Sequence, residues 1–521
     1  MDLVVIPNTQ GTLLLSMSYR LFNKTWLTGN GPHSTLIHIL DDYSLLYIFS
    51  LSRPAILDES GVDHGQIIEG GEWNRERWWY GLVRVCRRWR YIVFESASHL
   101  RLSLVCAHGT PVAEMLAHSP PLPLIIDHLE LNHDMTAEDE EGIILALQHR
   151  DRVRRIRLRK SVPILQKLTS SLDGEFPILE YLYAMPQQYQ RPLLDHNMSL
   201  NLPETFRAPH LRHLLLMRFA IPIGSPLLTT MGNLLTLSLS LIPPSAYFHP
   251  HHLLQRISLM PQLEHLGIFF NSHFPNRDIE RQLLRTRIMT RVTLPNLYHF
   301  GFQGASAYLE ALLPQVTFPL LQKLQVYFFN QLTYSIPHLQ QFMSSAGNLR
   351  FKTATLTFCA DYLSMYVYPH EEAKVFALST DFGGRHLDWQ VASAAQAFHA
   401  LRTVSSAVEH LSLEYARHSM PSEWNNEADR TQWRELLGSF VNVKTLSVDS
   451  ELVEQLSHAL QPGEGESPTE LLPELHELHK PDEPDEPGKL SHSAIGAPPD
   501  AFSSFTDARQ KAGRPVTLIH P

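Results

Sequence analysis

The sequence predicts an α/β chain in which a short helical domain at the N-terminus precedes an elongated solenoid of parallel strands. Three observations lead to this prediction. The 521 residues exceed what one compact core usually holds. An apolar-x-x-apolar-x-apolar phrase recurs along most of the chain. Ahead of the first copy, the segment near residue 85 has the apolar period of an amphipathic helix.

The predicted helical domain follows a loose arm at residues 1–35. Its main helix lies between Trp78 and Leu104, where arginines occupy most of the face opposite the apolar one. A second short apolar helix begins after Asp41 or Asp42, because either carboxylate can accept hydrogen bonds from the amides of the first turn. The apolar face of the main helix consists of Leu82, Val85, Cys86, Trp89, Ile92 and Val93.

The phrase Leu-x-x-x-x-Leu-Leu-x-Ile-Phe from Leu40, an insertion at residues 50–74 and then Val-Cys-Arg-Arg-Trp-Arg from Val85 together resemble the F-box. The following Ser-His-Leu-Arg-Leu-Ser-Leu is similar to the mushroom-type fungal variety of that family. The resemblance implies an F-box domain at residues 36–105 that binds the Skp adaptor and, through it, the cullin scaffold of an SCF ubiquitin ligase. The adaptor-binding residues that it implies are Leu45, Leu46, Ile48, Phe49, Val85, Cys86 and Trp89.

Copies of the apolar phrase lie roughly 23 to 35 residues apart, a spacing typical of leucine-rich repeats. In such a repeat a short strand buries alternate leucines and the chain then returns as a helix or coil. Return helices are expected near residues 227, 277, 307, 338 and 433. The sequence therefore predicts an irregular leucine-rich-repeat solenoid with parallel strands at residues 106–460. A globular α/β sheet is the alternative.

The composition changes after the last strong repeat. Residues 461–499 are rich in Pro and Glu, which cannot offset the entropy of ordering by burial, so a mobile loop is expected there. At residues 500–521 a helix with Phe502 and Phe505 on one face and a final strand are expected to cap the solenoid.

Charge and cysteine content limit the classes of function. A net charge of −10 argues against a nucleic-acid-binding protein, because such proteins neutralise phosphates with basic side chains. Cys86, Cys106 and Cys359 lack CxxC spacing, which fits a reducing compartment and excludes a RING-like zinc array. No apolar run has the length needed to span a bilayer. We expect an intracellular protein, in the cytoplasm, the nucleus or both, with no membrane partner.

The sequence gives no sign of catalytic chemistry. It contains no P-loop, no dinucleotide-binding GxGxxG and no GxSxG motif. The histidine cluster at residues 249–252 has no carboxylate or cysteine at ligand spacing, so no metal site is predicted. We expect no catalytic residue, no cofactor and no enzyme activity.

Two groups of residues are predicted to contact a target protein. Arg155, Arg157 and Arg159 alternate along one strand and would lie on one side of it, giving a basic surface for an acidic or phosphorylated target. The alternative is that they pair with the acidic residues at 139–141. His265 and His299 fall inside repeat phrases at positions expected to point out of the core.

The resemblance to the F-box, together with the repeats, implies a substrate-receptor subunit of an SCF-type ubiquitin ligase. The repeats would hold the target, whose identity the sequence does not give. The chain would contribute proximity, and the reacting groups would belong to other subunits. Two alternatives stay open. One is a leucine-rich-repeat scaffold outside any ligase, whose degenerate F-box only caps the array. The other is a hydrolase or lipid-binding enzyme on an α/β scaffold, which needs a pocket with convergent polar groups.

Overall fold

The structure is a computed structural model, and its contacts divide the chain into two compact units. One unit is Met1–Leu172 with Phe176–Leu179, and the other is Asp173–Glu175 with Glu180–Pro521. The predicted arm at 1–35 and most of the insertion at 50–74 lie outside the described residues. The residues described are 40–54, 76–129, 135–187, 199–271, 288–329, 335–345, 352–359, 362–368, 376–381, 387–416, 429–462, 467, 469–479 and 501–519.

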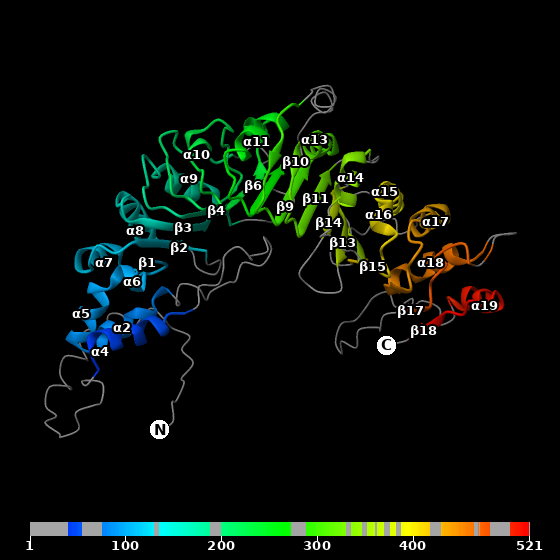
Figure 1. The fold of residues 1–521 in the computed structure, drawn as a ribbon, viewed down its shortest axis with the longest axis horizontal. Helices are drawn as coiled ribbons and strands as arrows, with labels where there is room; N and C mark the ends of the chain where they lie inside the picture. The colour runs from blue at the N-terminus through cyan, green and yellow to red at the C-terminus, as the bar shows by residue number, and fades with distance from the viewer. Residues whose placement is uncertain are drawn as a thin grey trace, which may run out of the picture. The chain divides into compact units, whose positions relative to one another are not determined.

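The first unit joins a group of short helices to three parallel strands (Figure 1). The helices that precede the strands are α2 (Asp42–Leu51), η3 (Trp78–Tyr80), α4 (Leu82–Val85), α5 (Arg87–Glu95) and α6 (Ala97–Leu100). The strands are β1 (Leu104–Cys106), β2 (Leu124–His128) and β3 (Val153–Lys160). The helices between and after them are α7 (Val112–His118), α8 (Ala137–Gln148) and α9 (Val162–Ser170).

The N-terminal helices are attached to the first strand and the loop after it by the side chains of Arg77, which precedes η3, and Trp79, in the middle of η3. The indole N–H of Trp79 donates to the carbonyl oxygen of Ser103 at 3.3 Å. The guanidinium of Arg77 donates to the hydroxyl of Thr110, in the loop after β1, at 3.1 Å. These bonds and the burial of Trp79 hold the helices to β1, and the helices and β1 belong to the same compact unit. The boundary at residue 105 between an F-box domain and the solenoid stays a prediction.

The second unit contains a long and mostly parallel sheet, with the order β4-β5-β6-β7-β9-β11-β14-β13-β12-β15-β16-β17-β18. Its strands are β4 (Tyr181–Pro186), β5 (His213–Met217), β6 (Thr236–Ile242), β7 (His265–Phe270), β9 (His299–Gly304), β11 (Lys323–Phe329), β12 (Thr353–Phe358), β13 (Tyr362–Tyr368), β14 (Phe376–Asp381), β15 (His410–Tyr415), β16 (Thr445–Val448), β17 (Glu477–His479) and β18 (Thr517–Ile519). A separate parallel pair is formed by β8 (Val292–Thr293) and β10 (Val316–Thr317).

Helices follow most of these strands and lie along one side of the sheet (Figure 1). Four of the predicted return helices are present as α10, α13, α14 and α17, and the one near residue 277 lies outside the described part of the chain. The helices and helical turns of this unit are α10 (Pro226–Thr229), η4 (Pro244–Ala246), α11 (Pro250–Ile257), α13 (Ser306–Leu312), η5 (Leu313–Gln315), α14 (Pro337–Ser345), α15 (Leu387–Ala400), α16 (Arg402–Ser405), α17 (Arg430–Gly438), η7 (Ser450–Leu452), α18 (Val453–Leu460) and α19 (Ser503–Lys511).

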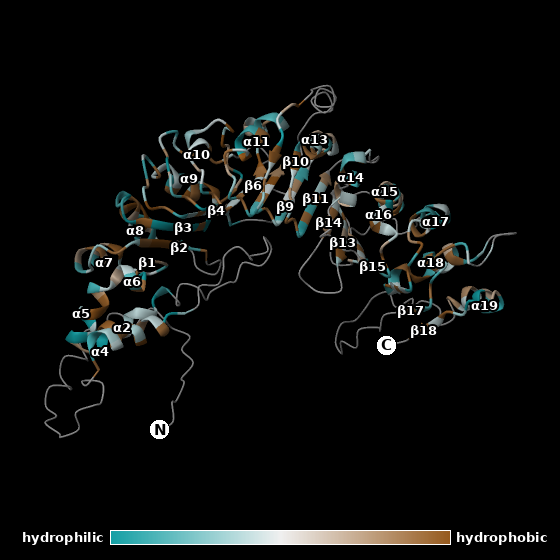
Figure 2. Ribbon diagram, viewed as in Figure 1, coloured by the Kyte–Doolittle hydropathy of each residue, from teal (hydrophilic) through white to brown (hydrophobic). Residues whose placement is uncertain are grey.

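The repeat phrase is in register from strand to strand, so the predicted α/β solenoid with leucine-rich parallel strands is confirmed. One continuous row of Cα partners runs through Leu214, Leu237, Leu266, Phe300 and Leu324, and all five side chains are buried. Burying alternate residues in this way is what the two-residue period of a strand requires. Much of the hydrophobic colour in Figure 2 accordingly lies on the strands.

Two features of the sheet differ from the prediction. β13 runs antiparallel to both of its neighbours, β12 and β14, so β11 pairs with β14 instead of the next strand along the chain. β17 lies inside residues 461–499, which were predicted as a loop, so the sheet extends further than expected. The capping helix and strand predicted at 500–521 are α19 and β18, and β18 pairs with β17 at the end of the sheet.

Neighbouring repeats are also joined on the helical side. The carboxylate of Glu310, in α13, accepts hydrogen bonds from the backbone N–H groups of His338 at 2.8 Å and Leu339 at 2.9 Å in the first turn of α14. These amides have no partner inside their own helix, so Glu310 supplies what the helix lacks. Burial raises the pKa of the Glu310 carboxyl, and the two hydrogen bonds act to lower it.

None of the helices in the described ranges has the length and hydrophobicity needed to cross a membrane.

Leu324→Ala is expected to lower the free energy of unfolding of the central repeats by about 2–5 kcal/mol, because it removes buried methyl groups and leaves a cavity. Leu320→Ala is the matched control, since Leu320 belongs to the same repeat but is 52% exposed. Urea titration read out by amide exchange in β9 and β11 measures both. Equal losses in the two variants would contradict the inward orientation of Leu324.

Candidate functional site

Two acidic residues, Asp41 and Asp42, make the side-chain contacts at the N-terminus of α2. Asp41 is the N-cap, and its carboxylate accepts from the backbone N–H of Ser44 at 2.7 Å. That hydrogen bond is the main cause that holds the pKa of Asp41 below its ordinary value. Asp42 forms an ion pair with Arg88 of α5, at 2.7 Å, and the same guanidinium donates to the carbonyl oxygen of Leu40. Arg88 thus ties α5 to the start of α2.

One face of α2 is buried inside the first unit. Leu45 and Phe49 are nearly inaccessible, and the ring of Phe49 packs edge-on against Trp89 with 4.8 Å between centroids. Cys86 is the N-cap of α5, where its sulfur accepts from the N–H of Trp89 at 3.5 Å. Of the residues that the resemblance assigned to adaptor contact, Leu45 and Phe49 therefore belong to the interior of the unit, and Leu46, Cys86 and Trp89 are half-buried.

The other face of α2 is apolar and exposed. Tyr43, Tyr47 and Leu51 repeat every fourth residue, which places them on one side of the helix beside Ile48. We call these four residues the α2 outer face. Their exposed fractions are 86% for Tyr43, 65% for Tyr47, 43% for Ile48 and 68% for Leu51. Val85 of α4 is also exposed. Groups of large exposed apolar side chains are a common feature of protein interaction sites, which makes the α2 outer face a candidate for one.

Sequence reasoning missed three of these four residues. The i, i+4, i+8 spacing of Tyr43, Tyr47 and Leu51 was visible in the sequence, but it lay beside the equally regular spacing of Leu45 and Phe49. Ile48 and Val85 are the two predicted adaptor residues that the structure leaves exposed.

The arginines of β3 share one side of the strand, as predicted, but they do not form an unpaired basic surface. Arg155 is opposite Ile125 and forms an ion pair with Glu76 at 3.4 Å. Arg157 is almost fully buried and pairs with Asp127 of β2 at 3.3 Å. Arg159 is half-buried. The alternative had placed the acidic partners at residues 139–141, whereas the partners seen for Arg155 and Arg157 are Glu76 and Asp127. Asp127 is beside Arg157 because the two residues are opposite each other on β2 and β3.

His265 and His299 lie on the predicted side of the sheet but are buried, which corrects the expectation that they project freely. They occupy equivalent positions of β7 and β9, and their Nδ1 atoms are 3.2 Å apart. Nε2 of His265 contacts the hydroxyl of Tyr298, and Nε2 of His299 lies 3.1 Å from Oε1 of Gln325. The two imidazoles thus form the centre of a chain of hydrogen bonds across three neighbouring repeats.

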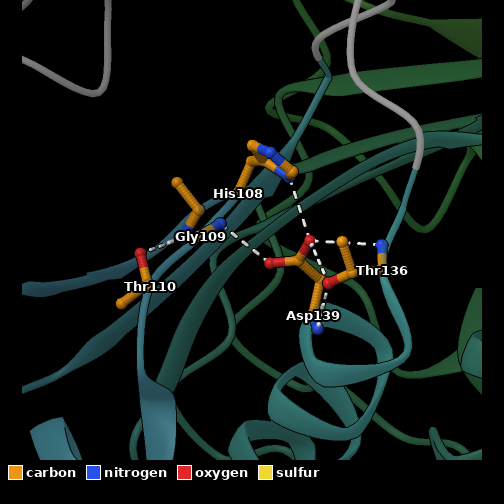
Figure 3. Close-up of polar contacts among 6 residues, drawn as sticks. His108, Gly109, Thr110, Thr136 and Asp139 are labelled. Carbon is orange, nitrogen blue, oxygen red and sulfur yellow. Dashed lines mark hydrogen bonds and ion pairs between the residues drawn. The ribbon is translucent and has the colours of Figure 1, made fainter. Parts of the chain in front are cut away.

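In the first unit, His108 and Asp139 form a His–Asp pair, an arrangement that occurs in catalytic bases. The other contacts of the Asp139 carboxylate show that it has a structural role. Nδ1 of His108 is 2.9 Å from the carboxylate of Asp139 (Figure 3). The same carboxylate accepts from the N–H of Gly109 at 2.8 Å and the hydroxyl of Thr136 at 2.8 Å. Burial acts to raise the pKa of Asp139, but these hydrogen bonds outweigh it and hold the pKa below its ordinary value. The cluster joins the loop after β1 to a capping box at the start of α8.

Asp139→Asn is expected to lower the free energy of unfolding of the first unit by about 1–3 kcal/mol, because an amide cannot satisfy the same donors and leaves buried groups unpaired. Glu138→Gln changes the neighbouring carboxylate in the same helical turn, but Glu138 is exposed, and the effect there should stay within about 0.5 kcal/mol. Thermal unfolding followed by amide exchange in α8 compares the two. An equal response would show that the Asp139 contacts do not stabilise this unit.

The second unit contains a cavity large enough to be considered as a ligand site. A cavity of about 410 Å³ lies between η5, β10 and α14, lined mainly by apolar side chains that include Leu313, Phe318 and Phe342. Thr317, His338 and Gln341 are among its polar lining residues. In the part of the chain that the structure describes, no group of three or more His, Cys, Asp or Glu side chains is arranged to hold a metal ion.

No protein-family model matches the sequence, and no curated protein matches it. Among solved structures, the leucine-rich repeat-containing protein LegL7 from Legionella pneumophila is similar at 11% sequence identity and a TM-score of 0.26. The match covers 80% of this chain and 99% of that protein. The assignment of the fold rests on the strand register described above.

Proposed function

We propose that this chain is a substrate-receptor subunit of an SCF-type ubiquitin ligase, in which the α2 outer face binds the Skp adaptor and the repeat sheet holds a target protein. The observation that carries the proposal is the two-sided apolar character of α2. One side is already buried against Trp89, yet Tyr43, Tyr47 and Leu51 on the other side remain exposed. Tyrosine is enriched among the residues that carry most of the binding energy at protein interfaces, and an aliphatic side chain such as Leu51 gains free energy when a partner removes it from water.

The proposed role needs no catalytic group in this chain. Holding a target beside a ubiquitin-charged enzyme raises the effective concentration of the reactants, which is a large contribution in itself. The long sheet suits that task because a solenoid offers an extended binding surface on which scattered residues set specificity. The cullin scaffold would be recruited through the adaptor.

The proposal is tested by mixing the purified full-length chain with a purified Skp adaptor and measuring complex formation by size-exclusion chromatography and calorimetry. A one-to-one complex is the expected result. The alternative, a repeat scaffold outside any ligase, is favoured by the bonds that attach the N-terminal helices to β1 through Arg77 and Trp79. A folded chain that does not bind the adaptor would overturn the ligase proposal and leave the capping role.

A further inference from the structure

The cavity between η5, β10 and α14 has the size and the inner wall of a small-molecule site. Its volume of about 410 Å³ is within the range of roughly 300–1,000 Å³ that ligand pockets occupy. Leu313, Phe318 and Leu321 line it and are each at most 7% exposed. The half-buried ring of Phe342 is edge-on to Phe318, with 5.9 Å between centroids. A molecule in this cavity would therefore meet hydrocarbon and two aromatic rings.

The exposed part of the lining carries polar groups that bind nothing within the protein. Thr317, His338 and Gln341 line the cavity and are exposed. Among the described residues, the Thr317 hydroxyl, the His338 imidazole and the Gln341 amide find no hydrogen-bond partner. Together these three side chains offer both donors and acceptors. The lining as a whole suits a ligand with an apolar body and one polar end.

An anionic end group is disfavoured, because a carboxylate already occupies the start of α14. Free N–H groups at the N-terminus of a helix attract anions. In α14 the N–H groups of His338 and Leu339 donate to Glu310, and that of Gln340 donates to the carbonyl oxygen of Ile336. The helix begins with a proline, which has no N–H group. The start of α14 therefore offers no donor to a second negative group.

A cationic end group is disfavoured because it would meet no acidic partner. Of the described residues that line the cavity only His338 can ionise, and it can only become positive. The basic residues of the adjoining segments, Arg291, Lys323 and Arg402, are not among these lining residues, and neither is Glu310. A cation would lose its hydration without gaining an opposite charge, and burying an unpaired charge is costly. A neutral ligand avoids both penalties.

We propose that this cavity binds a small neutral amphiphile, which places a hydrocarbon chain against Phe318 and Phe342 and a hydroxyl or carbonyl group among Thr317, His338 and Gln341. This inference goes beyond the proposed function and does not depend on it, since no residue of α2 takes part. Removal of the hydrocarbon chain from water supplies the driving force. A bound molecule would join η5 and β10 to α14, so slower amide exchange in these three elements reports its presence.

The test titrates the full-length chain with 1-decanol, decanoate, decylammonium and 1-butanol and follows amide exchange in η5, β10 and α14. The first three compounds share one chain, and at about pH 8 they are neutral, negative and positive. Butanol keeps the hydroxyl but has a short chain. 1-Decanol is expected to protect these elements at a concentration about 10-fold lower than either charged compound, and 1-butanol should protect them least.

Ser344 and Ser345 provide matched variants. Both are exposed on α14, and each hydroxyl donates to the carbonyl oxygen four residues before it, but only Ser345 lines the cavity. Ser345→Trp fills the space and should weaken decanol binding by at least about 10-fold, while Ser344→Trp should leave it within about 2-fold. Gln341→Leu keeps the approximate size of the side chain and removes the amide, so decanol should bind about 5-fold more weakly.

Three results would overturn the inference: no protection of η5, β10 and α14 by decanol, equal or tighter binding of a charged compound, or equal behaviour of the two tryptophan variants. Tyr47→Ala combined with Leu51→Ala changes only the α2 outer face, so decanol should protect α14 in that variant as before. If decanol protects α14 while the adaptor does not bind, only the ligase role falls. If the adaptor binds while decanol gives no protection, only this inference falls.

Discussion

Replacing Tyr47 and Leu51 together with alanine is expected to abolish complex formation with the Skp adaptor while leaving the chain folded. Both side chains are more than 60% exposed, so their loss leaves no cavity inside the unit. In a complex they would be buried, and truncating an interface anchor of this kind often costs about 2 kcal/mol or more. Even with incomplete additivity, two such losses weaken binding by at least about 100-fold. Calorimetry with the purified adaptor measures the change directly.

Two control variants separate loss of the surface from loss of the fold. Phe49→Ala removes the ring that packs on Trp89, and it should lower the free energy of unfolding by about 3–5 kcal/mol. Leu259→Ala removes an exposed apolar side chain from the second unit, so adaptor binding should stay at the level of the unmodified chain. Unchanged binding by the Tyr47 and Leu51 double variant would show that the adaptor, if it binds, uses another surface.

The repeat strands could be predicted from sequence because their signal is local. Each phrase places its leucines at alternate positions, and a one-residue shift would expose all of them, so the register of Leu237, Leu266 and Leu324 follows from the pattern itself. The exchange of β12 for β14 beside β11 could not be predicted in this way. Which strand pairs with β11 depends on contacts between distant segments, and no local period records that choice.

The candidate binding surface on α2 was harder to predict for a different reason. The helix has two regular apolar sets, one with Leu45 and Phe49 and another with Tyr43, Tyr47 and Leu51. Spacing shows that both sets exist but not which one the rest of the chain covers. The position of Trp89 decides it, because its ring occupies the side on which Phe49 lies. Sequence reasoning expected the Leu and Phe residues to meet the partner, and the structure buries them.

The sequence also did not reveal which residues pair with the polar side chains of the strands. The side of the strand was correct for Arg155 and Arg157, because alternation fixes it. Their carboxylate partners, Glu76 and Asp127, come from other segments of the chain and cancel the predicted basic surface. The hydrogen-bond partners of His265 likewise come from another segment of the chain, because Tyr298 and His299 belong to the next repeat.

His128 is the buried titratable group with the clearest consequence for stability. It lies at the end of β2, on the core side, with a 4% exposed fraction. Burial lowers the pKa of His128 to about 3, and the positive charge of Lys160 acts in the same direction while Asp139 opposes it. In an unfolded chain the pKa of histidine is about 6.5. The unfolded chain therefore binds a proton at His128 that the folded unit excludes. The stabilisation that comes from a neutral His128 is complete above pH 6.5 and decreases as the pH falls toward 3.

The first unit is accordingly expected to lose about 1.4 kcal/mol of unfolding free energy per pH unit below pH 6.5, which reaches on the order of 5 kcal/mol near pH 3. His128→Leu removes the titrating group and should flatten this dependence, so that between pH 7 and 4.5 the variant loses about 2–3 kcal/mol less than the unmodified chain. His99→Leu is the control, because His99 is exposed on α6 and its replacement should leave the slope unchanged. Urea titrations at each pH, read out by amide exchange in β2 and β3, avoid assuming that so long a chain unfolds in one step. Parallel pH profiles for the unmodified chain and the His128 variant would mean that the imidazole accepts a proton without disturbing the fold. The strands around it would then have to open to water more readily than their burial indicates.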